Sequence, residues 1–296
     1  MFAQSKIIEI TGGYHVWTRR VGESPIKLLL LHGGPGMTHE YLESFQDYLP
    51  NDGIEIYFYD QLGSYYSDQP DDPSLWRVDR FREEVEEVRQ NLSLDHFYLL
   101  GSSWGGFLAI EYAIKYGENL KGLILSNTTA SIASYSAYIN ELRSRLPQEV
   151  IKKLEEFETE GEYNHPEYER LLDEHLNNKY ICRLDPWPDA AIRGFSNLNQ
   201  QVYETLHGPN EFLVTGSYKD WNRWDDLSNI HVPTLILGAR HDSMSVADQE
   251  EMGKRIPSSR VNICKNGSHL SMWDDPDHYF SYLKTFIHDV EAGEFE

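Results

Sequence analysis

The sequence predicts an α/β protein in which helices cover both faces of a mostly parallel sheet and a helical cap is inserted. Strand and helix patterns alternate from about residue 7 to residue 126, as they do when helices connect parallel strands. Residues 127–229 change to helical patterns rich in Tyr, Trp and Glu, and strand character resumes at Val232. We therefore expect a core of residues 1–126 and 230–296, with residues 127–229 as the cap.

The first buried strand is followed by a glycine-rich loop. The apolar run Lys27–Leu31 has the length of a buried strand, and His32-Gly33-Gly34-Pro35-Gly36 comes directly after it. Residues without a Cβ let the backbone close on a tetrahedral oxygen, so we expect the Gly34 N–H to be an oxyanion donor. A phosphate-binding loop is the rival interpretation, but no Lys-Ser or Lys-Thr follows and no nucleotide-binding glycine pattern can be written here.

The next helical pattern carries much of the acidic charge. Phe81, Val85, Val88 and Leu92 fall on one helical face, which predicts that the acids of Glu83–Val88 face solvent. The net charge of the chain is −22. Binding to phosphates requires clustered Lys and Arg, so this charge argues against nucleic acid or an anionic membrane as a partner.

A serine stands between glycines where the following apolar strand gives way to a helix. Phe97–Leu100 forms the strand and Gly101-Ser102-Ser103-Trp104-Gly105-Gly106 the turn, after which an amphipathic helix is expected, with one face made of Phe107, Ile110, Ala113 and Ile114. This is the context of the nucleophile elbow G-x-S-x-G, whose tight turn projects the serine hydroxyl above the sheet. Ser103 is therefore the candidate nucleophile, and the backbone N–H of Trp104 is the second candidate oxyanion donor. Taken alone, the motif fits a Gly/Ser loop that caps a helix equally well.

A serine nucleophile needs a base and a carboxylate that orients the base. In a strand-elbow-helix architecture they follow the serine in the order Asp, His, each after a later strand. Asp242 ends the loop after the apolar run that begins at Val232, and His269 follows the short strand Arg260–Cys264. We predict that Ser103, Asp242 and His269 form a catalytic triad.

Two alternatives to this triad remain open in the sequence. His241 is the rival base, although its neighbour Asp242 stands where the acid is expected. Asp242 alone could also be a turn residue, or the N-cap of a helix that begins ahead of Ala247–Glu251. Chain order and strand context favour the triad over both.

These motifs together resemble the proline iminopeptidase family of α/β-hydrolases. The resemblance extends from about Ile7 to Ile287 and is carried by His32-Gly33-Gly34-Pro35-Gly36, Tyr59-Asp60-Gln61-Leu62-Gly63, Gly101-Ser102-Ser103-Trp104-Gly105-Gly106, Gly208-Pro209-Asn210-Glu211-Phe212 and Gly267-Ser268-His269. It implies an α/β-hydrolase fold. It also implies an enzyme that removes an N-terminal residue, often proline, from short peptides, or that hydrolyses amino-acid amides and arylamides.

The resemblance further implies how the free amine of a substrate is held. Members of the family use carboxylates from the cap and from beside the triad acid, so Glu211, in the cap motif, is implied as an amine ligand. Relatives often carry a second glutamate directly after the triad acid, whereas this chain has Ser243. With one carboxylate fewer, strict specificity for proline is not expected.

Cysteine usage and hydropathy bear on the setting of the protein. Cys182 and Cys264 are the two cysteines, and their wide separation argues against a disulfide framework and favours a cytoplasmic location. No apolar run approaches the roughly 20 residues of a membrane span. Neither H-E-x-x-H nor a cysteine cluster suggests a metal, and no cofactor is predicted. The oligomeric state is not predicted.

The sequence therefore predicts a serine hydrolase that releases an N-terminal amino acid, proline or another small or apolar residue, through an acyl-enzyme. Its substrate would be a small peptide, an amino-acid amide or an arylamide. The alternative is an esterase or lactonase with the same triad, which has no use for a buried carboxylate at an amine subsite. A non-catalytic binding protein on this fold would be expected to lack a triad member or the oxyanion glycines, and all of them are present.

Overall fold

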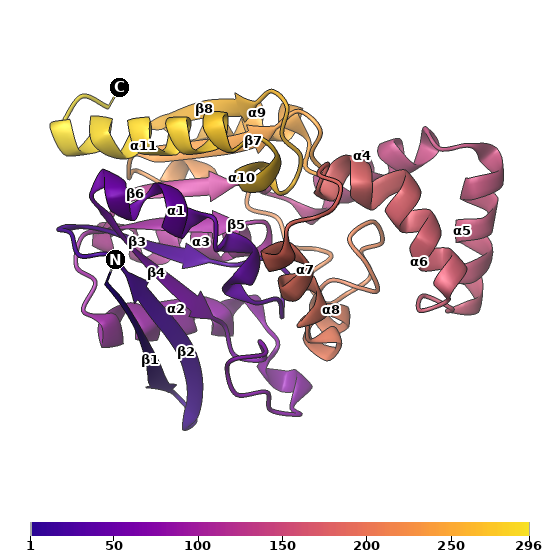
Figure 1. The fold of residues 1–296 in the computed structure, drawn as a ribbon, viewed down its shortest axis with the longest axis horizontal. Coiled ribbons are helices and arrows are strands. Elements are labelled where there is room, and N and C mark those ends of the chain that lie inside the picture. Colours follow the sequence, from indigo (N-terminus) through magenta and orange to yellow (C-terminus); the bar gives the residue numbers. More distant parts are fainter. Residues whose placement is uncertain (1, 296) are drawn as a thin grey trace.

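A mostly parallel sheet forms the centre of the molecule (Figure 1). The computed structural model describes residues 2–295 of the chain, and within them eight strands form one sheet in the order β1-β2-β4-β3-β5-β6-β7-β8. The strands are β1 (Ala3–Ile10), β2 (Tyr14–Val21), β3 (Ile26–Leu31), β4 (Ile54–Asp60), β5 (Phe97–Ser102), β6 (Leu120–Ser126), β7 (Thr234–Ala239) and β8 (Ser259–Cys264). β2 runs antiparallel to both β1 and β4, and the remaining pairings are parallel. The predicted fold class is confirmed.

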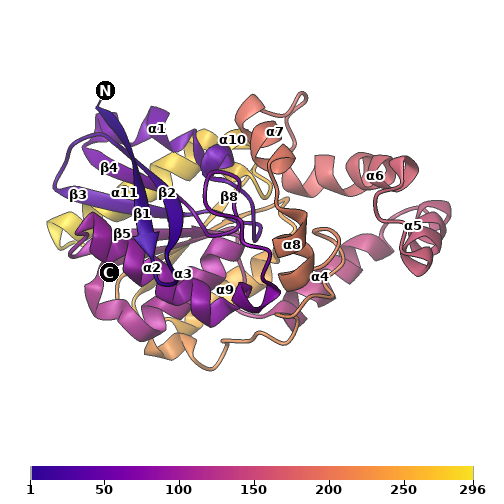
Figure 2. The same cartoon turned by 90° about the horizontal axis from the view of Figure 1, so that it is seen from below.

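Helices cover both faces of this sheet. The α-helices are α1 (Phe45–Tyr48), α2 (Val78–Leu92), α3 (Trp104–Tyr116), α4 (Ile132–Ser144), α5 (Gln148–Glu160), α6 (Pro166–Leu172), α7 (Asp189–Ser196), α8 (Gln200–Leu206), α9 (Val246–Arg255), α10 (Ser271–Asp274) and α11 (Pro276–Ala292). Figure 2 shows α2, α3 and α9 on one face of the sheet, with α1 and α11 on the other. Strands β4, β5 and β7 are consequently buried at every residue, which explains their continuous apolar runs.

The helix after the elbow differs from the amphipathic helix that was expected. Every residue of α3 from Trp104 to Ala113 is buried, and Ile114 is half-buried. The chain returning from residues 207–229 covers the side of α3 that was expected to face solvent. There Trp221 Nε1 donates to the buried Glu111 at 2.8 Å. Apolar periodicity could not reveal this cover, because it comes from a distant part of the chain.

The acidic run on α2 is also more buried than predicted. Glu84 lies inside the protein, where the Leu62 N–H donates to its carboxylate at 2.9 Å. Arg80 forms an ion pair with it, and the Tyr59 hydroxyl donates to it. A buried carboxylate requires such partners, so the prediction that all acids of this run face solvent was wrong at Glu84.

Helices dominate the segment predicted to be the cap. Helices α4 to α8 and the π-helical segment η5 (Asp173–Ile181) fall within residues 127–229, and η5 and α7 flank the non-helical stretch Pro186-Trp187-Pro188. Figure 1 shows α4, α5 and α6 extending to one side of the sheet. Beyond α8 the segment consists mainly of turns rather than helices. The exact cap boundaries stay a prediction. Between residues 2 and 295, no helix combines the length and apolar character needed to cross a membrane.

Candidate active site

Ser103 occupies the sharp turn between β5 and α3. Its backbone has φ +56° and ψ −122°, a conformation that non-glycine residues rarely adopt and that is typical of strained functional turns. Two hydrogen bonds hold this turn: the Ser103 N–H donates to Ser126 O at 3.0 Å, and Thr128 Oγ1 donates to Ser103 O at 2.9 Å. The elbow is therefore anchored on the end of the neighbouring strand, β6.

The elbow requires glycine on both sides of the serine. A Cβ added to Gly101 would lie 2.1 Å from Gly105 O, and one added to Gly105 would lie 2.2 Å from Leu31 O. Both distances are far below van der Waals contact with backbone that cannot move aside. The G-x-S-x-G pattern thus reflects direct packing of the turn against the end of β3.

His269 and Asp242 form a buried pair. His269 Nδ1 lies 2.7 Å from Asp242 Oδ1, so the other ring nitrogen, Nε2, is left for the serine. Burial disfavours the imidazolium, but the charge of Asp242 and its hydrogen bond outweigh burial and raise the pKa of His269 above its usual 6.5. The N–H groups of His269 and Leu270 donate to carbonyls at the end of η5, at 2.9 and 2.8 Å. The cap thereby supports the loop that carries the imidazole.

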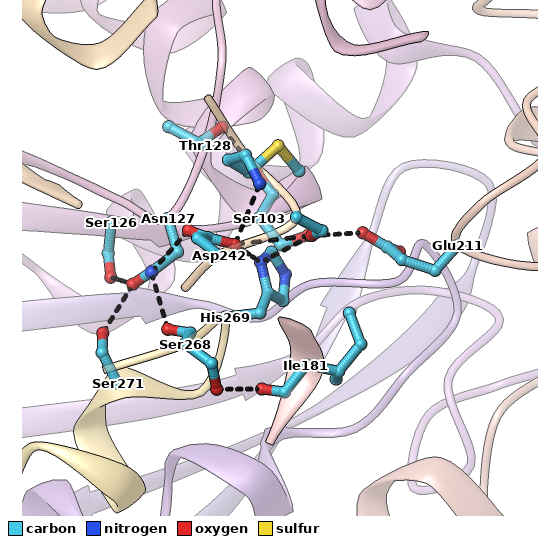
Figure 3. Close-up of polar contacts among 12 residues, drawn as sticks. Ser103, Ser126, Asn127, Thr128, Ile181, Glu211, Asp242, Ser268, His269 and Ser271 are labelled. Carbon is cyan, nitrogen blue, oxygen red and sulfur yellow. Dashed lines mark hydrogen bonds and ion pairs between the residues drawn. The ribbon is translucent and has the colours of Figure 1, made fainter. Parts of the chain in front are cut away.

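Asn127 holds the other oxygen of the Asp242 carboxylate (Figure 3). Its Nδ2 donates to Asp242 Oδ2 at 2.7 Å, while its Oδ1 accepts hydrogen bonds from the hydroxyls of Ser126 and Ser271. Asn127 is fully buried, with φ +48°. The sequence analysis missed this residue. Its one signal is its position directly after β6, at the edge of the sheet where the triad residues gather.

The structure bears on both alternatives to the triad, which are His241 as the base and Asp242 as a turn or N-cap residue. Within residues 2–295 the imidazole of His241 makes no hydrogen bond, and burial lowers its pKa. The N-cap of α9 is Ser245, whose hydroxyl accepts from the Asp248 N–H, so Asp242 is not that cap. Asp242 does stabilise a turn, since its Oδ1 accepts from the Met244 N–H at 3.0 Å. That turn bond is compatible with its bond to His269.

The glycine-rich loop presents one free N–H beside the serine. The Gly33 N–H is already used, because it donates to the Tyr41 hydroxyl at 2.6 Å. Among the described residues, the N–H groups of Gly34 and Trp104 donate to no acceptor. Gly34 has φ +111°, and a Cβ there would lie 2.7 Å from Met37 N. Trp104 is the first residue of α3, so the helix dipole adds positive potential at this point.

Gln61 connects the glycine-rich loop to the elbow. Its side-chain amide donates to His32 O at 3.0 Å, and its Oε1 accepts from the indole N–H of Trp104 at 2.9 Å. The backbone N–H of Gln61 also donates to His32 Nε2 at 3.1 Å. Burial lowers the pKa of His32, which keeps this ring neutral and able to accept. The sequence analysis noted the motif around Gln61 but assigned it no role.

Glu211 lies in a setting that offers it hydroxyls but no cation. Tyr135 donates to its Oε1, Ser243 Oγ lies 3.3 Å from the same oxygen, and the Tyr203 hydroxyl lies 3.4 Å from Oε2. Burial, and then the charge of Glu211, raise the pKa of both tyrosines well above 10, so they remain donors. Within residues 2–295 no Lys or Arg forms an ion pair with Glu211. Glu211, Ser103 and His269 line the same cavity, whose volume is about 190 Å³.

Comparisons with known proteins agree with this architecture. Residues 27–276 match the family described as alpha/beta hydrolase fold. The proline iminopeptidase of Flavobacterium johnsoniae is 45% identical over 283 residues, which cover 94% of this chain and 95% of the relative. The chain belongs to the proline iminopeptidase family of α/β-hydrolases. The resemblance inferred from the motifs is therefore confirmed.

Further relatives and solved structures are similar to this member of the proline iminopeptidase family over nearly its whole length. The proline iminopeptidase of Elizabethkingia meningoseptica is 45% identical, covering 96% of this chain and 97% of the relative. The crystal structure of VinJ superposes with a TM-score of 0.92 at 30% identity, covering 97% of this chain and 99% of that one. A proline iminopeptidase from Mycobacterium smegmatis gives a TM-score of 0.87 at 28% identity, covering 98% and 99%.

Ser243, the departure from the family pattern, lies between the triad and Glu211. Its hydroxyl is buried and lies 3.3 Å from Glu211 Oε1, 3.4 Å from Asp242 Oδ1 and 3.4 Å from His269 Nδ1. A neutral side chain between two carboxylates adds no negative charge. In this member of the proline iminopeptidase family, Glu211 is therefore not accompanied by a second carboxylate at position 243.

Proposed function

We propose that this chain is a serine aminopeptidase that releases an N-terminal amino acid, proline or another small or apolar residue, from short peptides, amino-acid amides or arylamides. The relatives named proline iminopeptidase support release of an N-terminal residue. The observation that carries the proposal is Glu211, a carboxylate that has no basic partner among residues 2–295 and lies in the cavity of Ser103 and His269. A substrate ammonium supplies the missing positive charge. An esterase would gain nothing from this carboxylate.

The proposed reaction proceeds in two steps that use the same residues. Ser103 Oγ attacks the aminoacyl carbonyl while His269 Nε2 accepts its proton, and Asp242 stabilises the imidazolium. The N–H groups of Gly34 and Trp104 donate to the oxyanion of the tetrahedral intermediate. His269 then passes the proton to the leaving amine, the C–N bond breaks, and an acyl-enzyme remains. Water, deprotonated by His269, attacks the ester in the second step and releases the amino acid and Ser103.

A small aromatic compartment beside Ser103 is the proposed site for the side chain of the released residue. Its volume is about 10 Å³, close to the minimum that holds one water. It is lined by Gly34, Ser103, Trp104, Phe107, Tyr135, His207, Glu211, Tyr218 and Met244. A small or apolar side chain fits there with the least rearrangement of the rings, which supports the proposed preference.

The test compares substrates whose N-terminal amine is free with one whose amine is acetylated, all with p-nitroaniline as the leaving group. The unaltered enzyme should hydrolyse prolyl- and alanyl-p-nitroanilide and leave N-acetylalanyl-p-nitroanilide nearly untouched. Glu211→Gln should lower kcat/KM for the free-amine substrates roughly 10²–10³-fold, since it removes one member of a desolvated ion pair. Equal hydrolysis of free and acetylated substrates by the unaltered enzyme would instead favour the esterase or lactonase alternative.

A second experiment tests the nucleophile itself. A fluorophosphonate should add its mass to the peptide that carries Ser103, and Ser103→Ala should abolish both labelling and turnover. Ser102→Ala is the matched control, because Ser102 is buried next to it and has no assigned role. Labelling that persists in Ser103→Ala and disappears in Ser102→Ala would overturn the assignment.

The proposed setting is the cytoplasm, with a small peptide or amide as the sole partner needed for the reaction. The reduced state expected of a cytoplasmic protein agrees with Cys182 and Cys264, which are both buried and free. Fractionation of cells that express the protein, followed by an arylamidase assay of each fraction, tests the location. Activity recovered mainly outside the cytoplasmic fraction would contradict it.

A further inference from the structure

Two compartments meet at Ser103, and they differ in size and lining. Both include Gly34, Ser103 and Glu211. The smaller is the aromatic compartment described above. The larger is the cavity of about 190 Å³, and it alone includes His269. Since the proton of His269 must reach the departing amine, the leaving group belongs in the larger compartment; this step rests on the proposed function.

The larger compartment is mainly apolar. Its apolar lining residues include Met37, Leu172, Ile181, Phe195, Leu198 and Leu270. Tyr41 and Asn177 are among its neutral polar lining residues, and burial raises the pKa of Tyr41 far above its usual range. No Lys or Arg occurs among the residues that line it. Glu211 is therefore the one fixed charge in its wall, and that charge is negative.

The mouth of this compartment is apolar as well. Phe195 lines the cavity and is also 38% exposed, so the cavity reaches the surface at α7. Ile192, on the same helix, is 46% exposed, and Leu184, shortly before that helix, is 37% exposed. Trp187 packs against Phe195 with ring centroids 5.3 Å apart. Exposed apolar side chains thus occur on α7 and just before it, close in sequence to the Phe195 that lines the cavity, and Arg193 on the same helix is paired with Glu40 and Glu43.

We infer that this enzyme selects aminoacyl substrates whose leaving amine is apolar and uncharged, and discriminates against dipeptides with a free C-terminal carboxylate. Such a carboxylate would stand one residue beyond the scissile bond, in a compartment whose wall has no Lys or Arg and one like charge, and whose His269 is already paired with Asp242. Desolvating an unpaired carboxylate is costly, whereas an apolar group gains from burial there. The proposed substrate class is therefore amides, arylamides and longer or C-terminally blocked peptides.

The test keeps the released residue constant and changes the leaving group. We expect prolyl-leucine amide to exceed prolyl-leucine with a free carboxylate by about 10–100-fold in kcat/KM. Prolyl-leucine amide should also exceed prolinamide, whose leaving group is ammonia. Equal kcat/KM for the free acid and the amide would overturn the inference. That result would leave the proposed function intact if N-acetylation still prevents hydrolysis.

A variant that adds a positive charge to the cavity wall tests whether this wall causes the discrimination against a free C-terminal carboxylate. Asn177, in η5, lines the compartment, while the exposed Asn164, also in the cap segment, does not. Asn177→Lys should reduce the amide-to-acid ratio of kcat/KM several-fold, and Asn164→Lys should leave that ratio unchanged. The ratio does not depend on how much of a preparation is folded. An equal effect of both variants would assign the discrimination to overall charge and overturn the role of the wall.

Discussion

Asn127 Nδ2 donates a hydrogen bond of 2.7 Å to the oxygen of Asp242 that does not face His269. The carboxylate is thus held from both sides, by an imidazole on Oδ1 and an amide on Oδ2. The amide is itself fixed, because Ser126 and Ser271 donate to its oxygen at 3.0 and 2.9 Å. Asn127 acts on the reaction through Asp242 and through Ser268 O, to which its Nδ2 also donates at 3.2 Å, so it is a positioning residue rather than a catalytic one.

Asn127→Ala should lower kcat about 10-fold or more while leaving KM nearly unchanged, because the substrate does not contact Asn127. The variant also leaves a buried oxygen of Asp242 without its donor, which costs about 1–3 kcal/mol of stability. Steady-state kinetics and thermal unfolding measure the two effects separately. Ser271→Ala is the control: it removes a bond to Asn127 without touching Asp242, so it should lower stability but not kcat. If Asn127 had a purely structural role, both variants would lose stability and neither would show a separate decrease in kcat.

The triad assignment predicts a ranking of three variants. His269→Ala should reduce kcat by several orders of magnitude, and Asp242→Asn somewhat less, because the acid orients the base without taking its proton. His241→Ala should retain most activity, since its ring makes no hydrogen bond within residues 2–295. Turnover of one arylamide by all three variants gives the ranking. Loss of activity in His241→Ala together with its survival in His269→Ala would reverse the assignment.

The raised pKa of His269 predicts where activity falls on acidification. The base must be neutral to accept the Ser103 proton, so protonation below its pKa stops the reaction. Asp242, and to a smaller degree Glu211, raise that pKa above 6.5, which places the acidic limb above pH 6.5. Inactivation by a neutral fluorophosphonate is the suitable measurement, because this reagent has no amine whose own titration would interfere.

The same experiment separates the influence of Glu211. Glu211→Gln removes a negative charge that favours the imidazolium, so the acidic limb should move to lower pH. Glu204→Gln is the matched control, because it makes the same charge change on the exposed surface of α8. An unchanged limb in Glu211→Gln, or an equal shift in Glu204→Gln, would contradict the predicted coupling.

Sequence patterns can identify candidate site residues when these residues directly follow apolar strands. Ser103, Asp242 and His269 could each be located because parallel strands bring their carboxyl ends to one edge of the sheet. Asn127 follows β6 in the same way, but a single asparagine after a strand has no distinguishing pattern. Its role emerges only when β6 and the loop after β7 are placed side by side, as in the β6–β7 pairing.

The surroundings of Glu211 and the cover of α3 could not be predicted in the same way. Tyr135 and Tyr203 come from α4 and α8, whose apolar periodicity gives a buried face but no packing partner. The burial of Glu84 likewise depends on the Tyr59 hydroxyl, which donates to it from β4, beside the i,i+4 ion pair with Arg80 on the same helix. The contacts with Tyr59, Tyr135 and Tyr203 depend on tertiary placement, and local sequence does not encode them.

A buried carboxylate on α3 joins the cap to the core. Glu111 Oε1 accepts from Trp221 Nε1 at 2.8 Å and pairs with Arg223 Nε at 2.6 Å, while Arg82 lies 3.4 Å from its other oxygen. Trp221 and Arg223 belong to the segment that returns from the cap to β7, and Arg82 belongs to α2. Glu111 therefore holds three separate parts of the chain at one point.

Glu111→Ala should lower the free energy of unfolding by about 2–4 kcal/mol, because it leaves an indole N–H and a partly buried guanidinium without their acceptor. Lys115→Ala, on the same helix, breaks an ion pair with Glu83 in which both side chains are 40% or more exposed, and should destabilise the protein much less. Urea unfolding of both variants, with the arylamidase rate measured before unfolding, distinguishes the two sites. If the cap is held to the core mainly elsewhere, Glu111→Ala will be no more destabilised than Lys115→Ala.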